Sequence, residues 1–151
     1  REGQDVTIAS TSYMTIEAIH AARLLADEGI SAEIIDVRTL NPFDESAIVA
    51  SVRKTGRLIT ADTASLSLGF GSEIVARVIE QAMPAFAVPP VRLALPDCPM
   101  PTSRTLSNGF YPRARDIAAA AYRLLGRPAP DRAVDESLPG DIPDPGFTGP
   151  Y

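Results

Sequence analysis

Two stretches decide the fold of this sequence, Asp36-Val37-Arg38-Thr39-Leu40-Asn41-Pro42-Phe43-Asp44 and Gly69-Phe70-Gly71-Ser72-Glu73-Ile74. Each follows a short apolar run typical of a buried strand, and each leads into a run whose apolar residues have helical spacing. Strands that alternate with helices predict a mostly parallel sheet with helices on both faces, a three-layer α/β fold. Both stretches then fall at the carboxyl ends of strands, where open α/β sheets bind their ligands.

Periodicity along the rest of the chain predicts the other elements. We expect strands over residues 6–9, 32–37, 58–62 and 91–95, and helices over residues 15–27, 45–54, 72–83 and 116–125. Gly29 and Gly56 follow two of these helices, where a left-handed end residue is favoured, and Asp44 precedes one as a candidate N-cap. We expect residues 1–126 to form the domain. Residues 127–151, rich in Pro, Gly and Asp, are expected to be a tail without a core of its own.

Composition limits the classes of partner. The 151 residues carry a formal net charge of −5, which argues against a nucleic-acid partner and provides no basic segment for an anionic membrane. No apolar run approaches the roughly 18 residues that a spanning helix needs. The single cysteine, Cys98, cannot form an internal disulfide, so the cytoplasm or another reducing intracellular compartment is expected. Because the sequence begins at Arg1 rather than Met, we also expect a piece of a longer protein.

The two loops supply the candidate site residues. Gly69 and Gly71 flank Phe70 before a helix, where free amides and the helix dipole attract anions. The motif matches no phosphate-binding fingerprint. Tight backbone geometry with Phe70 packed beneath it therefore explains the glycines better. Glu73 falls in the first turn of the helix, where a carboxylate interacts favourably with the dipole, or where it could bind a partner group.

Arg38 and Asn41 are the candidates in the other loop. A guanidinium suits a carboxylate or phosphate ligand. An internal ion pair that holds the Asn41-Pro42 turn explains Arg38 as well, and we favour the ion pair. His20, the single histidine, lies within a predicted helix and is interpreted as structural, and Cys98 as incidental. No spacing of Cys, His and acidic residues predicts a metal site.

Several runs in this order and spacing are shared with one family. They are Thr7-Ile8-Ala9-Ser10-Thr11-Ser12-Tyr13-Met14, Gly29-Ile30-Ser31-Ala32-Glu33-Ile34-Ile35-Asp36, Arg38-Thr39-Leu40-Asn41-Pro42-Phe43-Asp44, Lys54-Thr55-Gly56-Arg57-Leu58, Gly69-Phe70-Gly71-Ser72-Glu73-Ile74 and Pro96-Asp97-Cys98-Pro99-Met100-Pro101. Together they resemble the carboxy-terminal domain of transketolase-like, thiamine diphosphate-dependent enzymes. The resemblance is closest to the β subunit of 2-oxo acid dehydrogenases, such as pyruvate, branched-chain or acetoin dehydrogenase. It departs from the family at Thr63, where an acidic residue is common, at Leu68, where glycine is frequent, and at Leu106-Ser107, where a Leu-Glu pair is usual.

The resemblance implies a role in assembly within an oxidoreductase. The intact enzyme would decarboxylate a 2-oxo acid oxidatively and transfer the acyl group to lipoamide. In such enzymes other domains hold thiamine diphosphate and Mg²⁺, so we expect no catalytic, cofactor-binding or metal-binding residue on this chain. The implied partners are an α subunit or upstream domains, a second copy of the chain, and a lipoyl acyltransferase core.

Two alternatives stay open. The same kind of domain occurs in transketolase and deoxyxylulose phosphate synthase, which are transferases. A stand-alone module could instead bind a small anion between Arg38 and Gly69. On either interpretation, Arg38, Asn41, Gly69, Phe70, Gly71 and Glu73 are the candidate anion-binding or interface residues.

Overall fold

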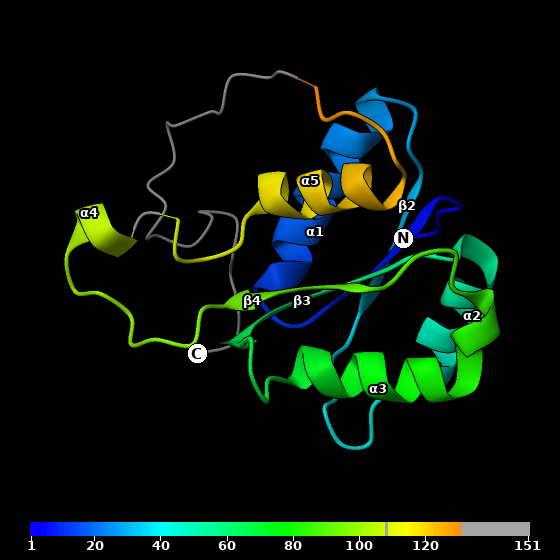
Figure 1. Ribbon diagram of the computed structural model, residues 1–151, viewed down its shortest axis with the longest axis horizontal. Coiled ribbons are helices and arrows are strands. Elements are labelled where there is room, and N and C mark those ends of the chain that lie inside the picture. The colour runs from blue at the N-terminus through cyan, green and yellow to red at the C-terminus, as the bar shows by residue number, and fades with distance from the viewer. Residues whose placement is uncertain (108, 131–151) are drawn as a thin grey trace.

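The computed structural model describes residues 1–107 and 109–130, and within them a parallel sheet lies between two layers of helices (Figure 1). The strands are β1 (Val6–Ser10), β2 (Ala32–Asp36), β3 (Leu58–Ser65) and β4 (Val91–Leu95). The helices are α1 (Met14–Asp27), α2 (Glu45–Thr55), α3 (Phe70–Ala82), the 3₁₀ helix η1 (Met83–Ala85), α4 (Arg104–Ser107) and α5 (Ala114–Leu124). The strand order is β2-β1-β3-β4 and every described neighbour is parallel. This confirms the predicted three-layer α/β fold.

Each face of the sheet has its own core. Helices α1 and α5 cover one face, and α2 and α3 cover the other (Figure 1). Successive side chains of a strand point to opposite faces. Ile8 of β1 accordingly packs in the core beneath α1, and its neighbour Ala9 packs in the core beneath α2 and α3. Burial on both faces explains why the strands read as apolar runs rather than as an alternating pattern.

The predicted helix ends are confirmed where the signal is local. Asp44 caps α2 by accepting a hydrogen bond from the amide of Ala47 at 3.2 Å. Gly56 ends the same helix with φ +69°, and its amide donates to the carbonyl of Val52 at 2.7 Å. Gly29 follows α1 with φ +71°. A Cβ at either glycine would strain this left-handed conformation, so glycine is the residue that such a position favours.

Three boundaries differ from the expectation by two residues or more, and several others differ by one residue. Strand β3 continues to Ser65 rather than ending at residue 62, because its exposed polar end still pairs with β4. Helix α3 begins at Phe70, two residues early. Helix α5 begins at Ala114 because a capping box forms, in which the Asp116 carboxylate accepts the amide of Arg113 at 2.8 Å. These ends depend on contacts that local periodicity does not encode.

Two predictions concern the ends and surroundings of the domain. The tail predicted over residues 127–151 lies largely outside the described residues, and the boundary at residue 126 stays a prediction. Among the described residues, the helices are all too short or too polar to cross a bilayer.

Candidate functional site

The two predicted loops lie at the same end of the sheet. The connection after β1 leads to α1 on one face, whereas those after β2 and β3 lead to α2 and α3 on the other (Figure 1). Such a switch in direction opens a crevice at the carboxyl ends of strands, where α/β proteins bind ligands. The loops also touch, because the rings of Phe43 and Phe70 pack edge to face with their centroids 5.2 Å apart. The region is therefore the natural place to look for a site.

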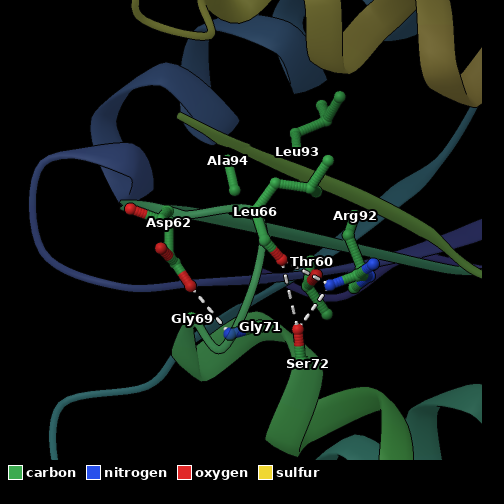
Figure 2. A pocket seen from close by; sticks show the side chains of 10 residues that line it. Thr60, Asp62, Leu66, Gly69, Gly71, Ser72, Arg92, Leu93 and Ala94 are labelled. Carbon is green, nitrogen blue, oxygen red and sulfur yellow. Dashed lines mark hydrogen bonds between the residues drawn. The ribbon is translucent and has the colours of Figure 1, made fainter. Parts of the chain in front are cut away.

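A buried carboxylate closes the junction between β3 and α3. Asp62, at only 3% exposure, accepts a hydrogen bond from the amide of Gly71 at 2.7 Å (Figure 2). It also accepts a hydrogen bond from the amide of Ala64. The first turn of a helix has free amides that attract anions. Here the chain's own carboxylate already occupies the position that an external anion would take.

Gly69 and Gly71 are required by close backbone approach. A Cβ at Gly69 would lie 2.2 Å from the carbonyl oxygen of Ser65. A Cβ at Gly71 would lie 2.8 Å from Oγ1 of Thr60 and 3.2 Å from a carboxylate oxygen of Asp62. Phe70 is half-buried against the core beneath α2 and α3. This geometry supports the packing interpretation of the Gly-Phe-Gly turn.

The space at this junction is too narrow for a water molecule. Thr60, Asp62, Gly71, Ser72 and Arg92 are among the residues around it (Figure 2). Oγ1 of Thr60 is buried and makes no hydrogen bond. It packs instead against the position where Gly71 lacks a side chain. The junction is a tight contact between strand and helix rather than a binding cavity.

Hydrogen bonds from β4 and its following loop hold the loop between β3 and α3. The guanidinium of Arg92 donates to the carbonyl of Leu66 at 2.7 Å and to the hydroxyl of Ser72. The Asp97 carboxylate accepts from the amide of Ser67 at 2.9 Å and from its hydroxyl at 2.6 Å. The Ser67 hydroxyl and amide hold the pKa of Asp97 below its usual range. Sequence reasoning missed Arg92 and Asp97 because neither belongs to a local motif.

Arg38, a candidate in the other loop, forms an ion pair at the surface. Nε of Arg38 lies 2.8 Å from a carboxylate oxygen of Asp36, and the Arg38 side chain is 85% exposed. Arg38 therefore forms an ion pair with Asp36, whose second oxygen accepts from the hydroxyl of Thr15 at 3.0 Å. That this pair holds the Asn41-Pro42 turn stays a prediction. Asn41 is exposed and precedes a cis peptide bond to Pro42.

Glu73 pairs along its own helix. Its carboxylate accepts from Nε of Arg77 at 2.7 Å, one turn further along α3. Glu73 and, on α2, Glu45 raise the pKa of Arg77 above its usual value. The same guanidinium lies over the ring of Phe43, 5.1 Å from its centroid. Glu73 thus helps to hold the loop after β2 against α3.

A second polar cluster joins α1 to α5. Glu17, 5% exposed, accepts from the guanidinium of Arg113 at 2.9 Å, from the amide of Ala114 at 2.7 Å and from the hydroxyl of Tyr13. These bonds fix the start of α5 on α1. His20 is half-buried on α1 and Cys98 is exposed. Within residues 1–107 and 109–130, no group of three or more Cys, His and acidic side chains is placed to hold a metal ion.

Large exposed apolar side chains occur on several connections at the same end of the sheet. The described large apolar residues exposed there are Leu40, Leu66, Leu68, Met100 and Leu106. They lie on the connections that follow β2, β3 and β4, and we call them the apolar rim. The Ser67–Asp97 bonds and the Phe43–Phe70 contact link these connections to one another. Large exposed apolar side chains on such connections are candidate contact points for another protein surface.

Known proteins resemble this sequence over most of its length. A family model described as the C-terminal domain of transketolase matches residues 1–117. The chain is 42% identical over 134 residues to the mitochondrial pyruvate dehydrogenase E1 component subunit beta-2 of Oryza sativa subsp. japonica, covering 89% of this chain and 36% of that protein. It is 41% identical over 125 residues to the acetoin:2,6-dichlorophenolindophenol oxidoreductase subunit beta of Cupriavidus necator, covering 83% of this chain and 37% of that protein.

A solved structure matches as well. It is described as a split gene transketolase, an inactive beta4 tetramer, and superposes with a TM-score of 0.70 at 34% identity. The match covers 83% of this chain and 40% of that one. The chain therefore spans only somewhat more than a third of the length of the curated relatives above.

Proposed function

Since this chain belongs to the transketolase C-terminal domain family, we propose that it is the assembly domain of a thiamine diphosphate-dependent 2-oxo acid dehydrogenase β subunit. The intact enzyme would decarboxylate a 2-oxo acid and transfer the acyl group to lipoamide. Curated relatives named as β subunits of pyruvate and acetoin oxidoreductases support this assignment. The chain corresponds to about a third of each, so it would contribute one domain of such a subunit.

The observation that carries the proposal is that, at the carboxyl end of the sheet, these polar groups are already paired while large apolar side chains are exposed. The α3 amide of Gly71 is bound by Asp62, and Arg38 is paired with Asp36. The apolar rim, by contrast, faces solvent. A small-molecule site needs converging polar groups within a cavity. Closed polar junctions beneath exposed leucines instead suit a contact with another protein surface.

The described residues do not fit thiamine diphosphate or Mg²⁺. A diphosphate needs free amides or cations around a cavity, but here Asp62 occupies the helix end and the junction is too narrow for a water molecule. We therefore assign the cofactor and its metal ion to other domains of the intact enzyme. In that assembly this chain orients its neighbours and takes no part in bond making.

The partners follow from the same proposal. An α subunit or upstream domains would complete the catalytic centre, a second copy would meet this chain, and a lipoyl acyltransferase core would receive the complex. The solved relative is described as an inactive tetramer of β chains, which supports self-association without activity. A free, exposed Cys98 is in keeping with a reducing compartment, the cytoplasm or the inside of an organelle.

The transferase alternative retains one specific support. The solved relative is named as a transketolase, so the intact enzyme could transfer a two-carbon unit between sugars instead. The anion-module alternative is less favoured, because the carboxylate of Asp62 at the α3 terminus repels the ligand that it requires.

The test uses this chain alone. We expect no release of carbon dioxide from pyruvate when thiamine diphosphate and Mg²⁺ are supplied, and we expect concentration-dependent self-association in sedimentation experiments. Turnover of pyruvate by this chain would overturn the proposal. A rise in melting temperature with inorganic phosphate, without self-association, would favour the anion module. Assay of the intact enzyme then separates the two enzyme classes, according to whether a 2-oxo acid or a ketose phosphate is consumed.

A further inference from the structure

We propose that Leu68 is a preformed contact residue through which two copies of this chain associate. The inference rests on the proposed assembly role and assigns it to one loop, residues 66–69 between β3 and α3. This loop is the central part of the apolar rim.

Leu68 combines two features that a folded domain does not need on its own account. Its side chain is 101% exposed, so it contributes nothing to the core. Its φ is +63°, in the left-handed region that glycine adopts without strain and a leucine side chain disfavours. An exposed apolar side chain in a disfavoured backbone conformation is explained when a second surface covers it.

The loop is held in this conformation before any partner arrives. Asp97 binds the Ser67 amide and hydroxyl at 2.9 and 2.6 Å, on one side of Leu68. Arg92 holds the carbonyl of Leu66, and Leu66 itself donates to the carbonyl of Leu95 at 2.8 Å. A preorganised loop loses little conformational freedom on binding, which strengthens association.

The surroundings favour a second copy over a charged partner. The charges next to the loop balance, since Arg92 also lowers the pKa of the nearby Asp97, and further along the rim Asp36 faces Arg38. In a two-fold dimer the same patch meets itself, so a surface with excess charge would repel its copy. An apolar projection among balanced charges avoids this repulsion and offers no complement to a strongly acidic or basic protein.

The experiment compares the self-association of the full chain with that of three variants by sedimentation equilibrium. Leu68→Gly removes the side chain and relieves the backbone strain, and Leu68→Asp places a charge in the contact. Met83→Asp is the matched control, because Met83 is 61% exposed and lies on η1, away from the rim. The melting temperature of each dilute variant is measured in parallel.

We expect both Leu68 variants to weaken self-association by about tenfold or more, equivalent to about 1.4 kcal/mol, and Met83→Asp to leave it unchanged. Leu68→Gly should also melt no lower than the parent, which separates a lost contact from a damaged fold. If the parent associates and the Leu68 variants associate equally well, or if Met83→Asp is as harmful, this inference fails while the proposed function stands. A parent that stays monomeric overturns both.

Discussion

The buried carboxylate of Asp62 on β3 accepts a hydrogen bond from the backbone amide of Gly71, in the first turn of α3, at 2.7 Å. The two residues are nine positions apart in the sequence, and this contact ties the start of α3 to the end of β3. The same contact leads to the first prediction.

Replacing Asp62 with alanine should destabilise the fold. The amides of Gly71 and Ala64 would lose their acceptor in a buried setting, which typically costs about 1–3 kcal/mol. Urea unfolding would measure the change in the free energy of unfolding. Asp36→Ala serves as control, because its ion pair with Arg38 is exposed and should contribute below about 1 kcal/mol. Equal losses in the two variants would contradict this account of the junction.

Gly71→Ala should be destabilising for a steric reason. The new Cβ would lie 2.8 Å from Oγ1 of Thr60, and overpacking of this kind typically costs about 1–3 kcal/mol. Thr60→Ala alone should cost only about 1 kcal/mol, for its buried methyl group, because the hydroxyl that it removes makes no hydrogen bond. We expect the double variant to recover part of the loss, and a thermodynamic cycle of the four proteins measures this coupling. Strictly additive effects would show that the clash lies elsewhere.

Glu17→Ala should weaken the attachment of α5 to α1. The buried carboxylate accepts from Arg113 and from the amide of Ala114, and removing one partner of a buried ion pair typically costs about 3–5 kcal/mol. Glu73→Ala is the matched control, since it removes an exposed pair with Arg77 that should contribute about 0.5 kcal/mol or less. Chemical denaturation measures the free energy of unfolding that each variant loses. A loss for Glu17→Ala as small as that for Glu73→Ala would contradict the prediction.

The acid stability of the domain should depend on Glu33. Burial alone would raise the pKa of this carboxyl, but hydrogen bonds from Lys54 and from the amide of Gly3 outweigh it and hold the pKa below its ordinary value of 4.5. Because the folded-state pKa is the lower one, the carboxylate stabilises the fold above the unfolded pKa, and this stabilisation is lost as pH falls through the folded pKa.

Glu33→Gln should therefore be less stable than the parent at neutral pH, and the difference should shrink as the solution is acidified below the ordinary pKa of 4.5. Urea unfolding at a series of pH values follows this difference. Lys54→Met, which removes the main hydrogen-bond donor, should reduce the same pH dependence. A difference between Glu33→Gln and the parent that stays constant with pH would rule out this linkage.

The sequence by itself determined the order and type of the main elements. The apolar runs, the helical spacing and the end residues Asp44, Gly29 and Gly56 act within a few residues of chain, so their effect can be read without a partner in space. The parallel three-layer architecture follows from this alternation. The same alternation of strands and helices also predicts that both candidate loops lie at the carboxyl end of the sheet, where the structure has them.

Only the tertiary structure decided what that end of the sheet does. Pairing with β4 extends β3, and the approach of α3 brings Gly71 to Asp62, so the helix terminus is filled from within. In the sequence, Leu68 is only a departure from a common glycine. Its exposure and its positive φ depend on the folded conformation of the loop between β3 and α3. These outcomes depend on groups that are distant in the chain, and local sequence patterns carry no information about which of them meet.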